Sequence, residues 1–216
     1  MFTGIIEEKG TIKQIQHVSE KSIQMAIGSS KVLEDIQIGD SISVNGICLT
    51  VTDFTETSFQ VDVMPETIKA TSLRMLEEGS NVNLERSIPA NGRFGGHFVS
   101  GHVDGIGTIV RKEKQENAIY YDVEIPGELV IYFIMKGSVA VDGVSLTVFG
   151  ISESTFTISL IPHTVSETVL GEKGENDIVN IECDMIAKHV KNMISQEHHG
   201  IDSKSEGSGQ SVSYNR

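Results

Sequence analysis

The sequence predicts an all-β protein, built as two tandem six-stranded antiparallel Greek-key barrels followed by a C-terminal α-helix. Three observations predict this fold. The chain repeats itself at a constant offset of 97 positions, each repeat alternates short β-branched stretches with turn residues, and an amphipathic segment follows the second repeat. Short strands in a flat sheet would leave open edges, and closure into a barrel removes those edges.

The repeat is clearest between residues 45–73 and 142–170, which align without a gap. Ten positions are identical, in the first copy Gly46, Leu49, Thr50, Val51, Glu56, Phe59, Pro65, Thr67, Thr71 and Leu73. The same offset aligns residues 82–85 with residues 179–182, so it holds across the chain. We therefore expect an N-terminal domain at 1–97, a C-terminal domain at 98–185, a trimerisation helix at 186–200 and a disordered tail at 201–216.

Each repeat contains candidate strands bounded by turn signals. In the first repeat they are Gly4–Ile15, Ser22–Ile27, Ser41–Val44, Cys48–Phe54, Ser58–Met64 and Asn81–Arg86. Asn45-Gly46 predicts a hairpin turn that needs positive φ, and Asp142-Gly143 repeats it. Pro65 and Pro162 each predict a short helix after the fifth strand of their repeat.

The C-terminal segment breaks the repeat. Its apolar residues recur at helical spacing, and the stripe consists of Ile186, Val190, Met193 and Ile194. Such a stripe favours either a contact between copies of the chain or packing across the chain's own barrel, and the sequence does not separate the two. The low apolar content after residue 200 predicts the disordered tail.

Composition narrows the function. The 216 residues carry 30 acidic and 17 basic side chains, and the net charge of −13 argues against nucleic acid or an anionic membrane as partner. We expect no signal peptide and no bilayer-spanning run. Cys48 and Cys183 do not make a disulfide framework, so we expect a cytoplasmic protein. His97 and His102 lack a zinc spacing, and we expect no metal site.

The two repeats differ at positions that carry reactive groups. Cys48 corresponds to Ser145, and Ile5 corresponds to His102. The other pairs of this kind are Asn45/Asp142, Gly39/Lys136 and Glu66/His163. Drift at exposed positions explains the last two pairs as well as function does. His102 lies beside glycine-rich turns and is the strongest candidate for proton transfer.

Four motifs resemble the riboflavin synthase family, whose members carry two lumazine-binding domains. They are MFTGIIEE, VNGICLTV, GGHFVSGHVDG and VDGVSLTV, and MPETIKATSL and IPHTVSET are closest to versions from Gram-positive, spore-forming bacteria. The resemblance implies a transferase that passes a four-carbon unit between two molecules of 6,7-dimethyl-8-(1-D-ribityl)lumazine. The products would be riboflavin and 5-amino-6-(D-ribitylamino)uracil, in the last step of riboflavin biosynthesis. It also implies a homotrimer and no metal or redox cofactor.

The resemblance further implies one pocket in each repeat, with the reacting pair held between barrels of two subunits. The first pocket would use Gly4, Ile5, Ile6, Cys48, Leu49, Thr50, Asp62, Val63, Met64, Pro65, Glu66 and Thr67. The second would use Gly101, His102, Val103, Ser145, Leu146, Thr147, Ser159, Leu160, Ile161, Pro162, His163 and Thr164, with Lys136 reaching from a neighbouring chain. The catalytic candidates are His102, Ser145, Thr147, Cys48 and Asp184, and the sequence does not say which is the base.

Two alternatives stay open at this point. Some relatives of this fold hold a lumazine or flavin as a fluorescent antenna, and the intact GHVD and SLTV motifs argue against that function. Enclosure in a lumazine synthase shell would not exclude catalysis, and nothing in the sequence specifies it.

Overall fold

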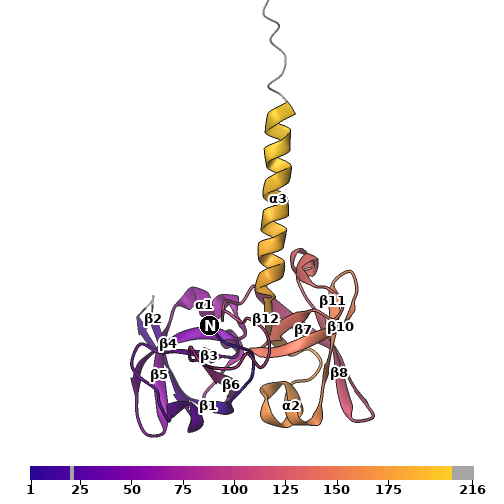
Figure 1. Ribbon diagram of the computed structural model, residues 1–216. Coiled ribbons are helices and arrows are strands. Elements are labelled where there is room, and N and C mark those ends of the chain that lie inside the picture. The colour runs from indigo at the N-terminus through magenta and orange to yellow at the C-terminus, as the bar shows by residue number, and fades with distance from the viewer. Residues whose placement is uncertain (20–21, 206–216) are drawn as a thin grey trace, which may run out of the picture.

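The computed structural model describes residues 1–19 and 22–205, with side chains described as far as residue 195. Two closed six-stranded antiparallel barrels lie side by side, and a helix stands away from both (Figure 1). The first barrel contains β1 (Glu8–Ser19), β2 (Ser22–Gly28), β3 (Ser41–Val44), β4 (Ile47–Phe54), β5 (Ser58–Val63) and β6 (Asn81–Arg86). The second contains β7 (Gly105–Gln115), β8 (Ala118–Glu124), β9 (Ser138–Val141), β10 (Val144–Ile151), β11 (Thr155–Leu160) and β12 (Ile178–Cys183). The expected fold class is confirmed.

The two barrels have equivalent strand orders, β1-β2-β5-β4-β3-β6 and β7-β8-β11-β10-β9-β12, so the repeat in the sequence is a repeat in space. Helices α1 (Pro65–Ala70) and α2 (Pro162–Glu167) follow the fifth strand of each barrel, as predicted. Short 3-10 turns fill the remaining connections: Lys31–Leu33, Ser72–Met75, Gly127–Tyr132 and Val169–Gly171. Each barrel encloses its own apolar core.

The first strand begins at Glu8, not at Gly4 as the pattern predicted, and continues to Ser19. The backbone N–H groups of Thr3 and Gly4 do not pair with a strand. They donate to the Glu85 carboxylate at the end of β6, at 2.7 and 3.0 Å. Gly4 also has a φ of 77°, in the left-handed region that interrupts a strand. The segment before β1 is therefore held at the end of β6 by a carboxylate and not by strand pairing.

The two predicted hairpin turns are confirmed, and they touch each other. Asn45 and Gly46 have φ values of 48° and 80°, and Asp142 and Gly143 have values of 45° and 80°. A Cβ placed on Gly46 would lie 2.6 Å from the Gly143 nitrogen. The glycines therefore supply the turn conformation and also let two backbones meet where the barrels join.

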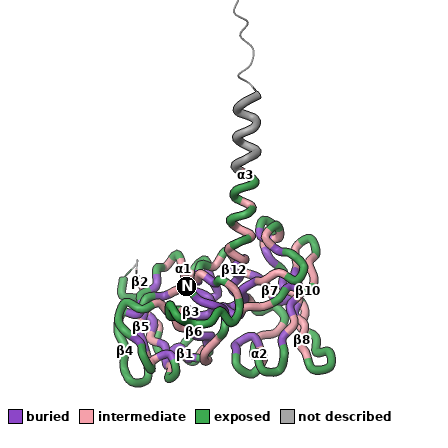
Figure 2. Tube along the Cα trace, in the orientation of Figure 1, coloured by how far each residue is buried: buried purple, intermediate pink, exposed green. Residues whose placement is uncertain are grey.

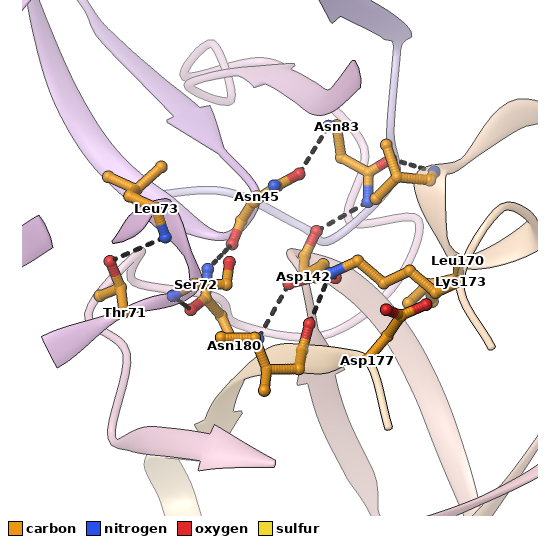
Figure 3. A network of polar contacts seen from close by, with 12 residues as sticks. Asn45, Thr71, Ser72, Leu73, Asn83, Asp142, Leu170, Lys173, Asp177 and Asn180 are labelled. Atoms are coloured by element: carbon orange, nitrogen blue, oxygen red, sulfur yellow. Dashed lines mark hydrogen bonds and ion pairs between the residues drawn. The ribbon is translucent and has the colours of Figure 1, made fainter. Parts of the chain in front are cut away.

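A reciprocal set of hydrogen bonds joins the barrels around these turns (Figure 3). The Asn83 amide donates to the Asp142 carbonyl at 2.9 Å, and the Asn180 amide donates to the Asn45 carbonyl at 2.8 Å. The side-chain carbonyls of the same two amides also bind the opposite barrel. Asn83 accepts from the Val169 N–H at 2.8 Å. Asn180 accepts from the Ser72 N–H at 2.7 Å. All four residues of the set, Asn45, Asn83, Asp142 and Asn180, are buried and paired, so the barrels are held in one arrangement.

Helix α3 (Met185–Ser205) projects away from the barrels (Figure 1). Its apolar stripe is exposed: Ile186 59%, Val190 49%, Met193 68% and Ile194 49%. The described part of the helix is largely exposed (Figure 2), and Ile186, Val190 and Ile194 line a groove with Ile131 and Ile134 of the second barrel. The helix also continues to Ser205, five residues into the segment expected as a tail. The rest of the expected tail, 206–216, lies outside the described residues. No described helix is both long and apolar enough to cross a membrane.

Candidate functional site

Two short segments, residues 2–6 and 99–103, cross between the barrels. They run antiparallel beside each other, with the Phe2 N–H donating to the Val99 carbonyl at 2.8 Å and the Val99 N–H returning a bond to Phe2 at 3.1 Å. Phe2 and Val99 are fully buried at this crossing. The segments that precede the first strand of each barrel therefore form part of the junction between the barrels.

Each segment is anchored to its own barrel and faces the other one. The Ser100 and Gly101 N–H groups donate to Glu182 at 2.6 and 2.9 Å, as Thr3 and Gly4 donate to Glu85. Burial raises the pKa of Glu85, although the bonds from Thr3 and Gly4 oppose that rise.

The carbonyls of the two segments then bind the opposite barrel. The Ser145 N–H donates to the Gly4 carbonyl at 2.8 Å, and the Cys48 N–H donates to the Gly101 carbonyl at 2.9 Å. The approach is close, since a Cβ on Gly4 would lie 2.6 Å from the Ser145 Cβ and one on Gly101 would lie 2.5 Å from the Cys48 Cβ.

This crossing corrects the grouping of residues expected from the sequence. Gly4, Ile5 and Ile6 were expected beside Cys48, and Gly101, His102 and Val103 beside Ser145. Instead, Ile6 packs against the core of the second barrel, and Val103 packs against the core of the first. His102 is exposed and lies in the segment that contacts Cys48. The reason is the exchange of the two segments, which no local sequence pattern encodes.

Strand alternation decides which expected pocket residues face outward. On β4, Cys48 is half-buried and Thr50 is exposed, while Leu49 is only 6% exposed and belongs to the core. On β5, Asp62 is exposed, and the buried Val63 points inward. Val51 pairs with Val61, so continuing that register places Thr50 opposite Asp62 and Cys48 opposite Met64. We define the first-barrel face as the four outward side chains, Cys48, Thr50, Asp62 and Met64.

The second barrel presents an equivalent face, which we define as Ser145, Thr147, Ser159 and Ile161. Val148 pairs with Ile158, and the same register places Thr147 opposite Ser159 and Ser145 opposite Ile161. Leu160 is buried in the core and Leu146 packs against it, so these two residues can offer a ligand only their backbone.

Helices α1 and α2 stand at the rims of the two faces. Pro65, Glu66 and Thr67 lie in α1, and Pro162, His163 and Thr164 lie in α2. In both helices a threonine carbonyl accepts a hydroxyl, Thr67 from Thr71 at 2.6 Å and Thr164 from Thr168 at 2.7 Å. The expected rim residues therefore have matching geometry in both barrels.

His97 is a functional candidate that sequence reasoning missed. Its Nδ1 lies 2.7 Å from the Ser145 Oγ, on the second-barrel face. Burial lowers the pKa of His97, although the charges of Asp184 and Glu182 oppose that change. The only signal was the GGHFVSGHVDG motif, which carried the family resemblance, while His97 itself was considered only as a zinc ligand.

Asp184 and Lys136 lie near the base of helix α3. Asp184 precedes the helix and accepts the Ile186 N–H at 2.8 Å, so it caps the helix. It also lines an apolar groove of about 560 Å³ with Ser138, the strand partner of Thr147. Lys136 is exposed and has a φ of 63°, whereas its counterpart is Gly39. The catalytic candidates thus fall into two clusters, with Cys48 and His102 at the first barrel and Ser145, Thr147 and Asp184 at the second.

Comparison with known proteins agrees with this architecture. The lumazine binding domain model matches residues 3–87 and again residues 100–184. The chain is 60% identical over 190 residues to riboflavin synthase of Bacillus subtilis strain 168, covering 88% of each chain. It is 48% identical over 194 residues to riboflavin synthase of Actinobacillus pleuropneumoniae, covering 90% of each.

Solved structures of LumP are also similar to the chain, at lower identity. LumP complexed with riboflavin matches with a TM-score of 0.77 and 29% identity, over 85% of this chain and 99% of that chain. LumP complexed with 6,7-dimethyl-8-(1'-D-ribityl) lumazine matches with a TM-score of 0.75 and 27% identity, over 84% of this chain and 98% of that chain. From the two matched barrels and the curated relatives, we conclude that the chain belongs to the riboflavin synthase family, whose members carry two lumazine-binding domains.

Proposed function

We propose that the chain catalyses the dismutation of two 6,7-dimethyl-8-(1-D-ribityl)lumazine molecules into riboflavin and 5-amino-6-(D-ribitylamino)uracil. The observation that carries this proposal is the pair of equivalent outer faces, one on each barrel, with different reactive groups at equivalent positions. Two identical substrates need two similar pockets, while a donor and an acceptor need different surroundings. A duplicated barrel with Cys48 on one face and Ser145 on the other meets both needs.

We propose that the expected binding residues group into two pockets, and the contacts of the crossing segments support the grouping. The first takes Cys48, Thr50, Asp62, Met64 and the rim of α1, together with Gly101, His102 and Val103. The second would take Ser145, Thr147, Ser159, Ile161 and the rim of α2, together with Gly4, Ile5 and Ile6, and with Lys136 reaching from a neighbouring chain. Both faces open outward, so a partner barrel would complete each pocket and hold two lumazine rings together. Such proximity would supply much of the rate acceleration.

The proposed chemistry begins at the C7 methyl group of one lumazine, whose carbanion delocalises into the ring. A group near the methyl must take its proton. We assign the proton transfer to the second pocket. The groups proposed for it are the hydroxyls of Ser145 and Thr147 and the nearby carboxylate of Asp184. The first pocket, with Cys48 and His102, would hold the other lumazine.

A spectrum tests this function directly. Purified chain incubated with the lumazine, without added metal or nucleotide, is expected to develop flavin absorption. LumP is a structural neighbour that holds the same ligand, so the alternative is an antenna that binds and does not react. Lumazine binding without any flavin formation would support the antenna and overturn the proposed function.

We further propose that the chain assembles as a homotrimer through α3. The support is the exposed apolar stripe of the helix beside the groove that contains Ile131, Ile134 and Ser138. Deleting residues 186–216 should give a smaller species by light scattering that binds ligand weakly and turns over poorly, whereas deleting only 206–216 should change neither property. A fully active trimer from the longer deletion would contradict this assembly.

We also place the protein in the cytoplasm, because both cysteines are free thiols. Enclosure by a lumazine synthase shell remains a proposal, and co-purification of the two proteins from the native host would test it.

A further inference from the structure

Two buried carboxylates occupy equivalent places near the ends of the last strands of the barrels. Glu85 on β6 and Glu182 on β12 are related by the repeat and are only 4% and 2% exposed. In the described part of the chain, every hydrogen bond to either carboxylate comes from a crossing segment, 2–6 or 99–103. A buried charge is costly unless hydrogen bonds satisfy it, so each carboxylate depends on the segment that it holds.

Both oxygens of each carboxylate are used. Glu85 Oε1 accepts the Thr3 N–H at 2.7 Å and the Thr3 hydroxyl at 3.0 Å, while Oε2 accepts the Gly4 N–H at 3.0 Å. Glu182 Oε1 accepts the N–H and the hydroxyl of Ser100, both at 2.6 Å, while Oε2 accepts the Gly101 N–H at 2.9 Å. An amide has only one acceptor oxygen, so glutamine could not replace either glutamate without facing an N–H with another N–H.

A single glycine connects each carboxylate to the opposite barrel. Gly4 gives its N–H to Glu85, and its carbonyl accepts the Ser145 N–H at 2.8 Å. Gly101 gives its N–H to Glu182, and its carbonyl accepts the Cys48 N–H at 2.9 Å. Because one residue makes both bonds, movement at the carboxylate is passed directly to the outer face of the other barrel.

The glycines leave little room for another position of the segments. A Cβ on Gly4 would lie 2.6 Å from the Ser145 Cβ, so moving the segment inward brings two backbones into conflict. Moving it outward breaks the bond between the Gly4 carbonyl and the Ser145 N–H. The Ser100 hydroxyl also accepts the His102 N–H at 3.3 Å, so the contacts of Glu182 extend to His102.

We propose that Glu85 and Glu182 are positioning residues that act crosswise, Glu85 on the second pocket and Glu182 on the first. This inference rests on the proposed function, in which those pockets bind lumazine. Each carboxylate belongs to one barrel and fixes the segment that forms a wall of the other barrel's pocket. A purely structural role would instead confine the effect of each glutamate to its own barrel.

Cys48 is a natural reporter of the first pocket. Its thiol is half-buried, whereas Cys183 is 2% exposed and burial raises the pKa of Cys183 to about 12. Methyl methanethiosulfonate should therefore label Cys48, and mass spectrometry of the full chain gives the rate. We expect Glu182→Gln to raise this rate by about 10-fold, because the segment over Cys48 is released, and Glu85→Gln to change it by less than about 2-fold.

Moving the reporter to the second pocket should reverse that order. In a chain carrying Cys48→Ser and Ser145→Cys, the thiol at position 145 should be labelled about 10-fold faster with Glu85→Gln and within about 3-fold of its parent with Glu182→Gln. Glu78→Gln and Glu175→Gln are matched controls at exposed, equivalent positions and should change neither rate. Faster labelling in the barrel that carries the substitution, or equal effects at both reporters, would overturn the proposal.

Two milder variants keep the test decisive if the glutamine variants do not fold. Thr3→Val and Ser100→Ala each remove one hydroxyl bond and leave the carboxylate in place. We expect Thr3→Val to speed labelling at position 145 by about 3-fold, and Ser100→Ala to speed labelling of Cys48 by the same factor. No difference between the two reporters would contradict crosswise action.

Protection by riboflavin connects the positioning to ligand binding. Riboflavin in the first pocket should slow the labelling of Cys48, and Glu182→Gln should raise the concentration that it needs by about 10-fold, compared with less than about 2-fold for Glu85→Gln. Equal weakening by both variants would overturn the proposal. If riboflavin protects neither reporter in its parent chain, the proposed pockets fail, and the labelling rates without ligand still decide whether the glutamates act crosswise.

Discussion

At the centre of the junction, the two barrels make the same hydrogen bonds with different charges. Asn45 accepts the Asn83 N–H at 2.7 Å, and Asp142 accepts the Asn180 N–H at 2.8 Å. The Asp142 carboxylate also pairs with Lys173 at 2.5 Å, whereas the first barrel has Leu76 at the position of that lysine. The fold therefore requires an acceptor at this turn and not a charge.

The C-terminal ends of the last strands of the two barrels, β6 and β12, differ in a similar way. The Arg86 N–H donates to Glu7 at 2.8 Å, and the Cys183 N–H donates to Asp104 at 2.8 Å, so each barrel has a carboxylate at this place. In the first barrel the guanidinium of Arg86 itself neutralises that carboxylate. In the second barrel the cation is Lys188 of helix α3, and the ion pair docks the base of the helix.

The largest expected effect comes from disturbing the contact between the two hairpin turns. Gly46→Ala combines an unfavourable φ of 80° with a Cβ 2.6 Å from the Gly143 backbone. Gly39→Ala is the matched control, because its φ is 94° and its Cβ would meet nothing within 4 Å. We expect Gly39→Ala to cost about 1–2 kcal/mol and Gly46→Ala clearly more, in the free energy of unfolding by urea. Equal losses would mean that the turns do not hold the barrels together.

The second test converts the buried ion pair into its first-barrel equivalent. Lys173→Leu leaves the fully buried Asp142 carboxylate without its cation and should cost about 3 kcal/mol or more of stability. Adding Asp142→Asn removes the charge and reproduces the Asn45 and Leu76 pattern, so the double variant should recover most of that loss. Urea unfolding of the three proteins measures this, and a double variant as unstable as the single would contradict the equivalence.

Lys136 and Gly39 give a test in which stability and activity should separate. An L-residue at a φ of 63° costs about 1–2 kcal/mol, so Lys136→Gly should leave stability unchanged or raise it slightly. We propose that Lys136 binds substrate from a neighbouring chain, so losing that charged hydrogen bond should reduce kcat/KM by about 10-fold or more. Full activity in Lys136→Gly would contradict a role of Lys136 in substrate binding.

The smallest expected effect is a pH dependence confined to the first barrel. Burial opposes ionisation of Glu7, but the hydrogen bonds and charge of Arg86 hold the pKa of Glu7 below its ordinary value of 4.5. Glu7 therefore adds stability above that pH, and the contribution is lost as the pH falls through the lowered pKa. Arg86→Gln should destabilise by about 1 kcal/mol at neutral pH and by less in acid. A loss that does not shrink in acid would contradict this.

The sequence predicted the parts of the fold that depend on local patterns. The strands, the Asn-Gly and Asp-Gly turns and the proline-initiated helices follow from side-chain alternation and backbone preferences, and the offset of 97 relates the two barrels. The start of β1 at Glu8 was missed, because Thr3 and Gly4 bind a carboxylate that lies far along the chain.

The site was less predictable, because its residues meet only through tertiary contacts. The pairing of Gly4 with Ser145 and of Gly101 with Cys48 follows from the crossing segments and from no local sequence pattern. His97 carries no local signal, since only the folded chain brings it to Ser145. The stripe on α3 was visible, but its direction depends on the contact between Lys188 and Asp104 at its base.

We propose that the two equivalent faces have unequal roles, with proton transfer at the second. It is tested most directly by measuring kcat and riboflavin affinity for Cys48→Ser and Ser145→Ala side by side. Cys48→Ser replaces the thiol with the hydroxyl of the other barrel and should keep kcat within about 3-fold, with a modest loss of affinity. Ser145→Ala should lose about 10²-fold in kcat with its affinity retained. A large loss of kcat in Cys48→Ser with intact affinity, together with an active Ser145→Ala, would contradict the account.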